Sequence, residues 1–226
     1  MKLSATLLTL ACLCALPAMA EITPTPAGAK ITLDSVTTEV MVCSPTQVRV
    51  IKYIGAYDGP AATGAKPDLK RIADHGKYKI DTGEYYVAIN EKDGNVSFWD
   101  HNGTLIMAEQ HRTSSLAPVT GTDSYSVRQD FQFGRADVQT IATPGVDKNL
   151  IGTLAELGSA LPTPCVVTDK GFAVIWQSGL PGRMDDTPGR KVKKPGDVTF
   201  TSDTTQAIDY LFLFPASTSS LTSFDW

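Results

Sequence analysis

The sequence predicts an all-β protein, an antiparallel β-sandwich with long loops and little helix. Many short runs are rich in β-branched and aromatic residues, and turn signals separate them at intervals of about 8 to 12 residues. No internal repeat, glycine-rich phosphate loop or heptad pattern interrupts these runs. This combination is typical of a β-sandwich.

The first twenty residues have the organisation of a secretory signal peptide. Lys2 gives a positive start, Leu3–Leu16 is apolar, and Ala18-Met19-Ala20 is a small-residue cleavage signal. The apolar run is shorter than the about 20 residues that a transmembrane helix needs. We therefore expect cleavage after Ala20, no membrane span, and export to the periplasm or the exterior. A lipid anchor on Cys12 is the alternative.

The rest of the chain divides into a lead-in, one domain and a tail. Residues 21–30 contain the Pro/Gly-rich stretch TPTPAGAK, which predicts a flexible lead-in. Residues 31–214 hold the strand signals and predict the β-sandwich domain. Residues 215–226 predict a disordered tail.

The first half of the domain begins with strand signals in Ile31–Ser44 and Gln47–Ile54, followed by a loop at Tyr57–Asp68 and a strand at Glu84–Asn90. These strand segments alternate in polarity or run apolar, with many β-branched residues, whereas the loop has no apolar periodicity.

The stretch VSFWDHNGTLIMAE predicts a tight hairpin. Asn102-Gly103 tolerates the positive φ angles of a two-residue type I′ turn. In that register Phe98 lies opposite Met107 and Trp99 opposite Ile106, so both faces of the ribbon are apolar. We therefore expect the hairpin inside a layered structure, as part of a three-stranded meander with the strand before it.

The second half of the domain contains further strands and two long loops. Strands are predicted at Ser124–Gly134, Cys165–Thr168, Phe172–Trp176, Asp197–Ser202 and Gln206–Phe214. Gly145–Pro164 predicts a loop with a brief strand, and Gly179–Gly196 predicts a charged loop rich in proline and glycine.

Composition and charge exclude several kinds of partner. The formal net charge is −4, and the short cluster Lys191, Lys193 and Lys194 is too small to indicate a nucleic-acid partner. Cys43 and Cys165 would remain after signal cleavage, either as a stabilising disulfide or as two buried free thiols. These cysteines and three separated histidines do not form a zinc pattern, and we expect no cofactor.

Six segments between Gln47 and Phe214 resemble a known family in their order and spacing. They are QVRVIKY, EYYVAINEKDGNVSFWDHNGTLIMAE, VRQDFQFGRAD, NLIGTLAEL, TPCVVTDKGFAVIWQSG and AIDYLFLF. Together they resemble the N-terminal β-sandwich of glycoside hydrolase family 31 (GH31), the retaining α-glycosidases that include α-glucosidases and α-xylosidases. The resemblance implies a galactose-mutarotase-like supersandwich and a role in carbohydrate metabolism, with an α-glucoside or α-xyloside as the carbohydrate.

The resemblance does not extend to the catalytic part of the family. Retaining glycosidases use two carboxyl groups about 5–5.5 Å apart, and in this family both are aspartates on a barrel that follows the sandwich. A barrel takes about 250 residues, whereas only residues 215–226 follow the sandwich in this sequence. We therefore expect a non-catalytic domain that helps to shape the sugar site and packs on a missing barrel through an exposed apolar patch.

The resemblance implies one substrate-binding candidate, Glu156, and no catalytic residue. In the family a loop of the sandwich reaches over the barrel mouth, and the matching region here is Asn149–Pro164. Gly158 stands where relatives often have an aspartate, so a plain surface glutamate at position 156 is the alternative.

Other residues that suit a binding role have plainer explanations. Asp185 and Asp186 could ligate calcium, but no spaced partners accompany them, and a solvated loop explains the pair. Trp99 and Trp176 could stack on sugars, but core packing is the stronger interpretation for tryptophans within apolar strands.

Two further functions stay open. A stand-alone exported carbohydrate-binding or docking module is the main alternative. A remote alternative is an aldose epimerase, which needs a glutamate base and a histidine acid. The histidines His75, His101 and His111 occupy turns or a strand end, outside any motif that resembles an epimerase site.

Overall fold

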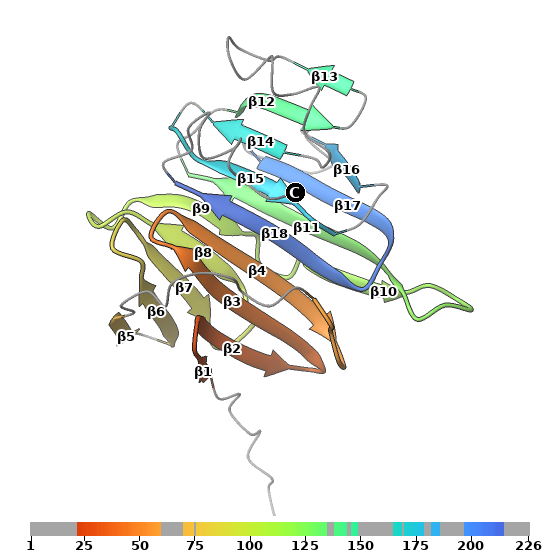
Figure 1. Cartoon of the computed structure of the whole chain (residues 1–226), viewed down its shortest axis with the longest axis horizontal. Helices are drawn as coiled ribbons and strands as arrows, with labels where there is room; N and C mark the ends of the chain where they lie inside the picture. Colours follow the sequence, from red (N-terminus) through yellow and green to blue (C-terminus); the bar gives the residue numbers. More distant parts are fainter. Residues whose placement is uncertain are drawn as a thin grey trace, which may run out of the picture.

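The computed structural model describes residues 22–59, 70–74, 76–134, 138–143, 146–148, 165–168, 170–178, 182–185 and 197–214. In this part of the chain the regular elements are all β-strands, and they form two antiparallel sheets packed face to face (Figure 1). The predicted all-β sandwich is confirmed. The same residues contain no helix long and apolar enough to cross a membrane.

Sheet A combines strands from both ends of the domain. Its strands within the described residues follow the order β1-β2-β3-β4-β18-β15-β14-β12-β13. They are β1 (Thr23–Thr25), β2 (Gly28–Leu33), β3 (Val36–Ser44), β4 (Gln47–Ile54), β18 (Ala207–Leu213), β15 (Ala173–Trp176), β14 (Cys165–Thr168), β12 (Val138–Thr143) and β13 (Val146–Lys148). The β4–β18 ladder joins the two ends of the domain, because β4 is an early strand and β18 is the last strand of the described residues.

Sheet B is built mainly from the middle of the chain. Its strands follow the order β16-β17-β11-β9-β8-β7-β6-β5, with β10 paired to β11 beside this path. They are β16 (Gly182–Asp185), β17 (Asp197–Thr205), β11 (Tyr125–Phe133), β9 (Leu105–Glu109), β8 (Val96–Trp99), β7 (Tyr86–Asn90), β6 (Lys77–Asp81), β5 (Lys70–Asp74) and β10 (Ser115–Pro118). The predicted three-stranded meander is confirmed as β7, β8 and β9.

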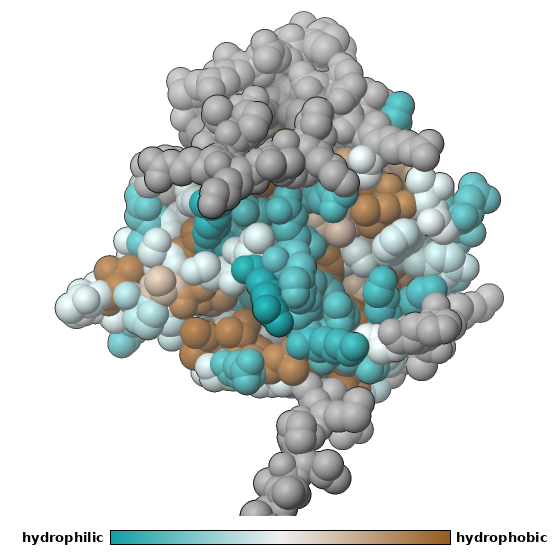
Figure 2. Space-filling view, turned by 180° about the vertical axis from the view of Figure 1, so that it is seen from behind, coloured by the Kyte–Doolittle hydropathy of each residue, from teal (hydrophilic) through white to brown (hydrophobic). Residues whose placement is uncertain are grey.

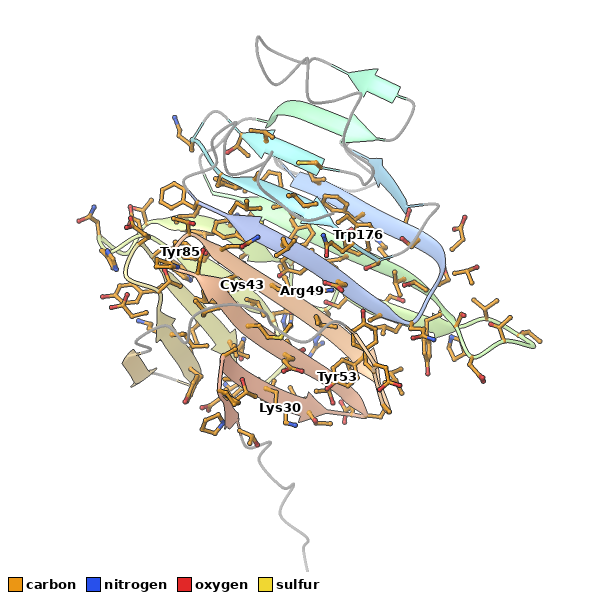
Figure 3. All side chains as sticks on the ribbon, in the orientation of Figure 1. Lys30, Cys43, Arg49, Tyr53, Tyr85 and Trp176 are labelled. Carbon is orange, nitrogen blue, oxygen red and sulfur yellow. The ribbon has the colours of Figure 1, made fainter. Side chains whose placement is uncertain are left out.

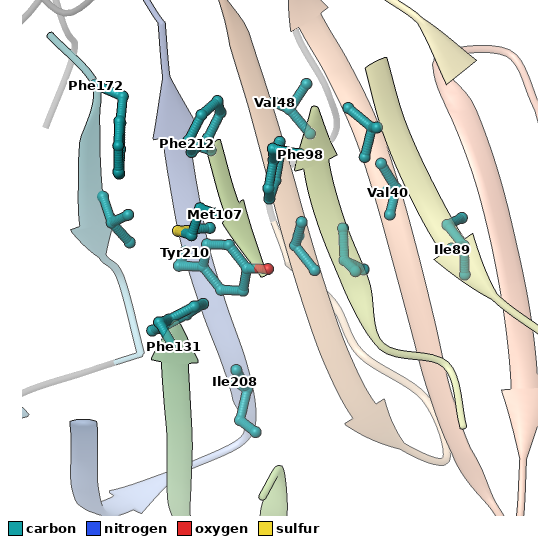
Figure 4. Close-up of a cluster of buried hydrophobic side chains, with 14 of the residues drawn as sticks. Val40, Val48, Ile89, Phe98, Met107, Phe131, Phe172, Ile208, Tyr210 and Phe212 are labelled. Carbon is teal, nitrogen blue, oxygen red and sulfur yellow. The ribbon is translucent and has the colours of Figure 1, made fainter. Parts of the chain in front are cut away.

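The core between the sheets is rich in aromatic side chains. Phe98 of β8 stacks on Phe212 of β18 with 4.0 Å between ring centroids, and Phe131 of β11 meets Tyr210 of β18 edge-on at 4.9 Å (Figure 4). Each pair joins sheet B to sheet A, and all four residues belong to one buried cluster. Burial of such side chains stabilises by roughly 1.5–3 kcal/mol each, so the core holds the two sheets together.

A buried ion pair also connects the sheets. Lys52 of β4 lies with its Nζ atom 2.6 Å from Oε2 of Glu109 on β9, and both side chains are almost fully excluded from water. Glu109 further accepts hydrogen bonds from the Tyr210 hydroxyl at 3.0 Å and from the backbone N–H of Val96 at 2.7 Å. Because the charges are paired and hydrogen-bonded, the sandwich tolerates them in its interior.

The central strands of sheet A are buried on both faces. Every residue of β14, β15 and β18 is buried, including outward-facing Ile175 and Leu211. This is why these segments are largely apolar instead of alternating, with Thr168 and Asp209 as the polar exceptions. The exposed apolar patch expected for barrel packing does not lie on these strands.

The lead-in predicted for residues 21–30 is corrected by the structure. Thr23–Thr25 pairs with Gly28–Lys30 across a turn at Pro26-Ala27, and Ala29 is fully buried in the core. Proline suits such a turn because its φ angle is fixed. The predicted loop at Gly179–Gly196 likewise contains a strand, β16, which pairs with β17.

The predicted register of the β8–β9 hairpin is half right. Phe98 pairs with Met107 as expected, but Trp99 pairs with Leu105 and not with Ile106, because the register shifts by one residue. The turn is wider than two residues, since Asp100 donates its backbone N–H to the Thr104 carbonyl. The Asp100 side chain stabilises this wider turn by accepting two backbone hydrogen bonds, which the Asn-Gly signal did not reveal.

Candidate functional site

The outer face of sheet B carries an open groove with a volume of about 480 Å³. Strands β6, β7 and β8 and the β8–β9 turn form it. The lining residues are Lys77, Lys79, Tyr86, Ala88, Trp99, Asp100, His101, Asn102 and Gly103, and together they define what we call the Trp99 groove. Seen from behind, the surface of the molecule mixes apolar and polar areas side by side (Figure 2).

The floor of the groove is a small residue between longer ones. Val87 and Ile89 of β7 face the core, so Ala88 between them faces outward. In the sheet register Ala88 lies between Lys79 of β6 and Ser97 of β8. A methyl group in that position leaves a depression that the neighbouring side chains surround.

Two aromatic rings form one wall. Tyr86 and Trp99 are direct cross-strand partners, so both side chains stand on the outer face of the sheet. The Trp99 indole donates its Nε1–H to Ser97 Oγ at 2.9 Å, which fixes the ring along its own strand. Lys77 Nζ lies 5.4 Å from the centre of the Trp99 ring, and His101 meets Tyr86 edge-on at 4.7 Å.

The β8–β9 turn supplies a rigid polar rim. Asp100 Oδ1 accepts hydrogen bonds from the backbone N–H groups of Asn102 at 2.9 Å and Thr104 at 2.7 Å. The Thr104 hydrogen bond is the main reason that the pKa of Asp100 is lowered, so its carboxylate is anionic at neutral pH. Gly103 closes the turn with φ +79°, a conformation that favours glycine.

A second polar cluster lies on the outer face of sheet A. Arg49 of β4 donates its Nε–H to Asp209 Oδ1 of β18 at 2.9 Å, and the Tyr57 hydroxyl donates to Asp209 Oδ2 at 3.2 Å. Figure 3 shows Arg49 close to Cys43 of β3. Burial first, and then the Asp209 charge, raise the pKa of Tyr57 to about 12. Asp209 is itself only 2% exposed, so this cluster connects β4 with β18 and offers no open site.

The buried carboxylates of the described residues all have cationic partners. Glu109 is paired with Lys52, Asp209 with Arg49, and Asp130 with Arg128 at 3.0 Å. A general acid or nucleophile must be available to a substrate, whereas these groups are committed to the fold. No cluster of three or more histidine, cysteine, aspartate or glutamate side chains suited to a metal occurs among the described residues.

The predicted site residues fall into three groups. Glu156, His75 and Asp186 lie outside the described residues, and Asp185 lies on β16, so the substrate-binding and calcium hypotheses stay predictions. Trp176 is fully buried and stacks on Phe200, which confirms core packing.

Trp99, in contrast, is half-buried and lines the groove, so its assignment to the core is wrong. The described histidines are exposed, and each contacts an aspartate: His101 with Asp81, and His111 with Asp93. The epimerase alternative gains no support from these two contacts, because both histidines lie at exposed turns.

The two cysteines are free thiols. Strands β4, β18 and β15 lie between β3, which carries Cys43, and β14, which carries Cys165. Four strand spacings amount to about 19 Å, far beyond the about 7 Å between Cα atoms that a disulfide allows. Of the two possibilities that the sequence left open, the structure therefore shows the free thiols.

Most of the groove has no sequence signal of its own. Tyr86, Ala88 and Trp99 lie in predicted strands, and their alternation with core residues marks an outward face. Lys77 and Lys79 lie on β6, which the sequence did not predict as a strand. Because β6 was not predicted, the pairing of strands that places the lysines near Trp99 could not be predicted either.

Comparison with known proteins identifies the fold. No protein-family model and no curated protein matches the sequence. A GH31 α-xylosidase from a soil metagenome, solved with xylose, matches with a TM-score of 0.60 and 16% identity over 88% of this chain and 32% of that chain. The cycloalternan-forming enzyme from Listeria monocytogenes, solved with a pentasaccharide substrate, matches with a TM-score of 0.61 and 13% identity over 86% of this chain and 20% of that chain.

A further match is the GH31 dextranase of Flavobacterium johnsoniae, solved with glucose, with a TM-score of 0.55 and 10% identity over 86% of this chain and 26% of that chain. The chain therefore spans less than a third of each of these enzymes and has the fold of that part of them. At these identities the similarity establishes the fold alone.

Proposed function

We propose that this chain is a non-catalytic β-sandwich domain of a GH31-type α-glycosidase, exported by its N-terminal signal peptide. Its role is to pack on a catalytic barrel and to help shape the site for an α-glucoside or α-xyloside. The observation that carries the proposal is the fold match, which covers 88% of this chain but only 32% of a GH31 α-xylosidase. This chain therefore has the fold of one structural unit of such an enzyme.

The pairing of the buried carboxylates with cations favours a non-catalytic role over a catalytic one. Retaining glycosidases need two carboxyl groups about 5–5.5 Å apart that can reach a sugar. The buried carboxylates of the described residues, Glu109, Asp130 and Asp209, are each neutralised by a lysine or an arginine. They are paired within the sandwich and are not free to exchange protons with a substrate.

An assay of the purified full chain tests the proposal. We expect no release of 4-nitrophenolate from 4-nitrophenyl α-glucoside or α-xyloside above the rate in buffer. Turnover that follows the protein through every purification step would overturn the proposal. A second test reads the DNA downstream of codon 226 for a barrel-coding segment, and co-expression of that barrel should restore hydrolysis.

A stand-alone carbohydrate-binding module is the second candidate. The Trp99 groove favours it, because the whole lining comes from β6, β7, β8 and the turn after β8, without any other domain. Unrelated DNA downstream, together with sugar binding by the isolated chain, would favour this candidate over the first.

A further inference from the structure

We propose that the Trp99 groove binds a neutral oligosaccharide, with one sugar ring lying against the indole of Trp99. The choice of a carbohydrate rests on the proposed function, and the structure supplies the place and the contacts. The groove volume of about 480 Å³ falls in the range of roughly 300–1,000 Å³ that is usual for small-molecule sites.

The aromatic wall suits the face of a sugar ring. A pyranose has C–H bonds on its faces and hydroxyl groups around its edge, so it packs a face on an aromatic plane while its hydroxyls stay polar. Trp99 offers such a plane, and its hydrogen bond to Ser97 holds the ring in place. Tyr86 lies directly beside it in the register and extends the wall.

Lys77 is compatible with a ligand on the indole. Its ammonium group lies 5.4 Å from the ring centre, and a cation–π contact at a surface site is weak. The flexible side chain of Lys77 therefore yields its place to a sugar ring. Its ammonium group then remains near the groove as a hydrogen-bond donor for a sugar hydroxyl.

The groove carries charges of both signs, which suit the hydroxyl groups of a neutral sugar. Lys77 and Lys79 supply positive charge on one side, and the Asp100 carboxylate supplies negative charge on the other. Neutral hydroxyls find an acceptor in Asp100 and donors in the lysines and Asn102.

The rim is organised before a ligand arrives. Two backbone N–H groups hold the Asp100 carboxylate, and Asp100 and Thr104 are joined by a further backbone hydrogen bond at 3.0 Å. His101 is oriented by its contact with Tyr86. A rigid rim lowers the entropy lost on binding, which helps an open site to hold a sugar.

The test is an NMR titration of the full chain, labelled with nitrogen-15. The probes are maltotriose, isomaltotriose and the disaccharide α-xylosyl-(1→6)-glucose. We expect at least one of them to shift the indole N–H signal of Trp99, identified by its absence in Trp99→Phe, and to leave the signal of buried Trp176 unchanged.

Variants then assign the binding energy. Trp99→Ala should weaken the affinity about tenfold or more, as expected for an aromatic anchor, and Tyr86→Ala should weaken it by a smaller factor. Tyr53→Ala is the matched control, because it removes an aromatic ring from the outer face of sheet A and should leave binding unchanged. The thermal unfolding of each variant shows that the fold is retained.

Several outcomes would overturn this inference. They are binding of none of the three sugars, unchanged affinity in both Trp99→Ala and Tyr86→Ala, or binding restricted to sulfated or uronic-acid oligosaccharides. Hydrolysis of an aryl α-glycoside by the purified chain would overturn the proposed function instead and would leave the result for the groove intact.

Discussion

Lys52 and Glu109 carry opposite charges on facing sheets, at 2% and 0% side-chain exposure. Removing two charges from water costs about as much as their attraction returns, so such a pair contributes little net stability. If one partner is removed, the remaining buried charge has lost its hydration and has no attraction to offset that loss. The pair therefore favours one arrangement of the sheets, because a sandwich in which Lys52 does not face Glu109 would bury an unpaired ion.

Breaking the pair gives the first prediction. Lys52→Met should lower the free energy of unfolding by about 3–5 kcal/mol, because the Glu109 carboxylate stays buried without its cation. The double variant Lys52→Met, Glu109→Gln should recover much of this loss, since the amide oxygen accepts from the Val96 N–H, the amide NH2 group donates to the Tyr210 hydroxyl oxygen, and no charge remains. Urea unfolding measures both, and a double variant as unstable as Lys52→Met would contradict the argument.

Two buried tyrosines allow a matched comparison. The Tyr85 hydroxyl has no hydrogen-bond partner among the described residues, whereas the Tyr210 hydroxyl donates to Glu109. Tyr85→Phe should raise the free energy of unfolding by about 1 kcal/mol, and Tyr210→Phe should lower it by about 1 kcal/mol. Denaturation at neutral pH measures both effects, and equal effects of the same sign would show that the hydroxyl environments do not matter.

Tyr57 gives a prediction for alkaline pH. Its pKa is raised from the ordinary value of 10 to about 12, chiefly by burial. In the unfolded chain the phenol ionises near its ordinary pKa, so the Tyr57 contribution to stability is complete below pH 10 and is lost as the pH rises towards 12. Stability should fall over this window, and Tyr57→Phe should make the fall less steep. An identical pH profile for the two proteins would contradict the assignment.

At the scale of the elements, the β8–β9 turn connects the fold with the Trp99 groove. Asp100→Ala removes the acceptor of two backbone hydrogen bonds and should lower the melting temperature, whereas Asp100→Asn keeps an acceptor oxygen and should lower it less. Because the pKa of Asp100 is lowered, its contribution is present above the ordinary value of 3.8 and is lost as the pH falls through the folded pKa. Melting curves at neutral and acidic pH measure this contribution. The melting temperatures of the wild type and Asp100→Ala should converge at acidic pH, and a difference that persists there would refute the argument.

The elements that the sequence predicted are those whose pattern and burial agree. Apart from Asp209, Ala207–Leu213 is apolar because both of its faces are covered, and β8 alternates in burial because one face meets the core. Strand β6 was missed although Lys77 and Lys79 alternate with apolar residues, because a run of five residues with Ile80 as its single β-branched residue is a weak signal. The hairpin register failed for a different reason: the Asp100 side chain, and not the Asn-Gly pair, determines the size of the turn.

The candidate site was predicted only in part for a related reason. Trp99 was recognised as a residue suited to sugars, but a ribbon apolar on both faces predicts burial on both faces. In the structure the outer face is only partly covered: Trp99 is half-buried there, and Ala88 lies on the floor of the groove beside it. Such a depression depends on which residues are neighbours across three strands, and one strand of the three was not predicted.

At the scale of the whole molecule, the two sheets share one core and should lose their structure together. Phe98 of sheet B stacks on Phe212 of sheet A, and one buried cluster includes residues of both sheets. Phe98→Ala should therefore cost about 3–5 kcal/mol and reduce amide exchange protection in β4 and β18 as much as in β7. Trp99→Ala serves as the control, since it truncates the outer face of the same strand and should leave protection in sheet A nearly unchanged. Loss of protection confined to sheet B in Phe98→Ala would mean that the sheets open independently, and a sandwich of that kind could not hold a rigid groove on one face.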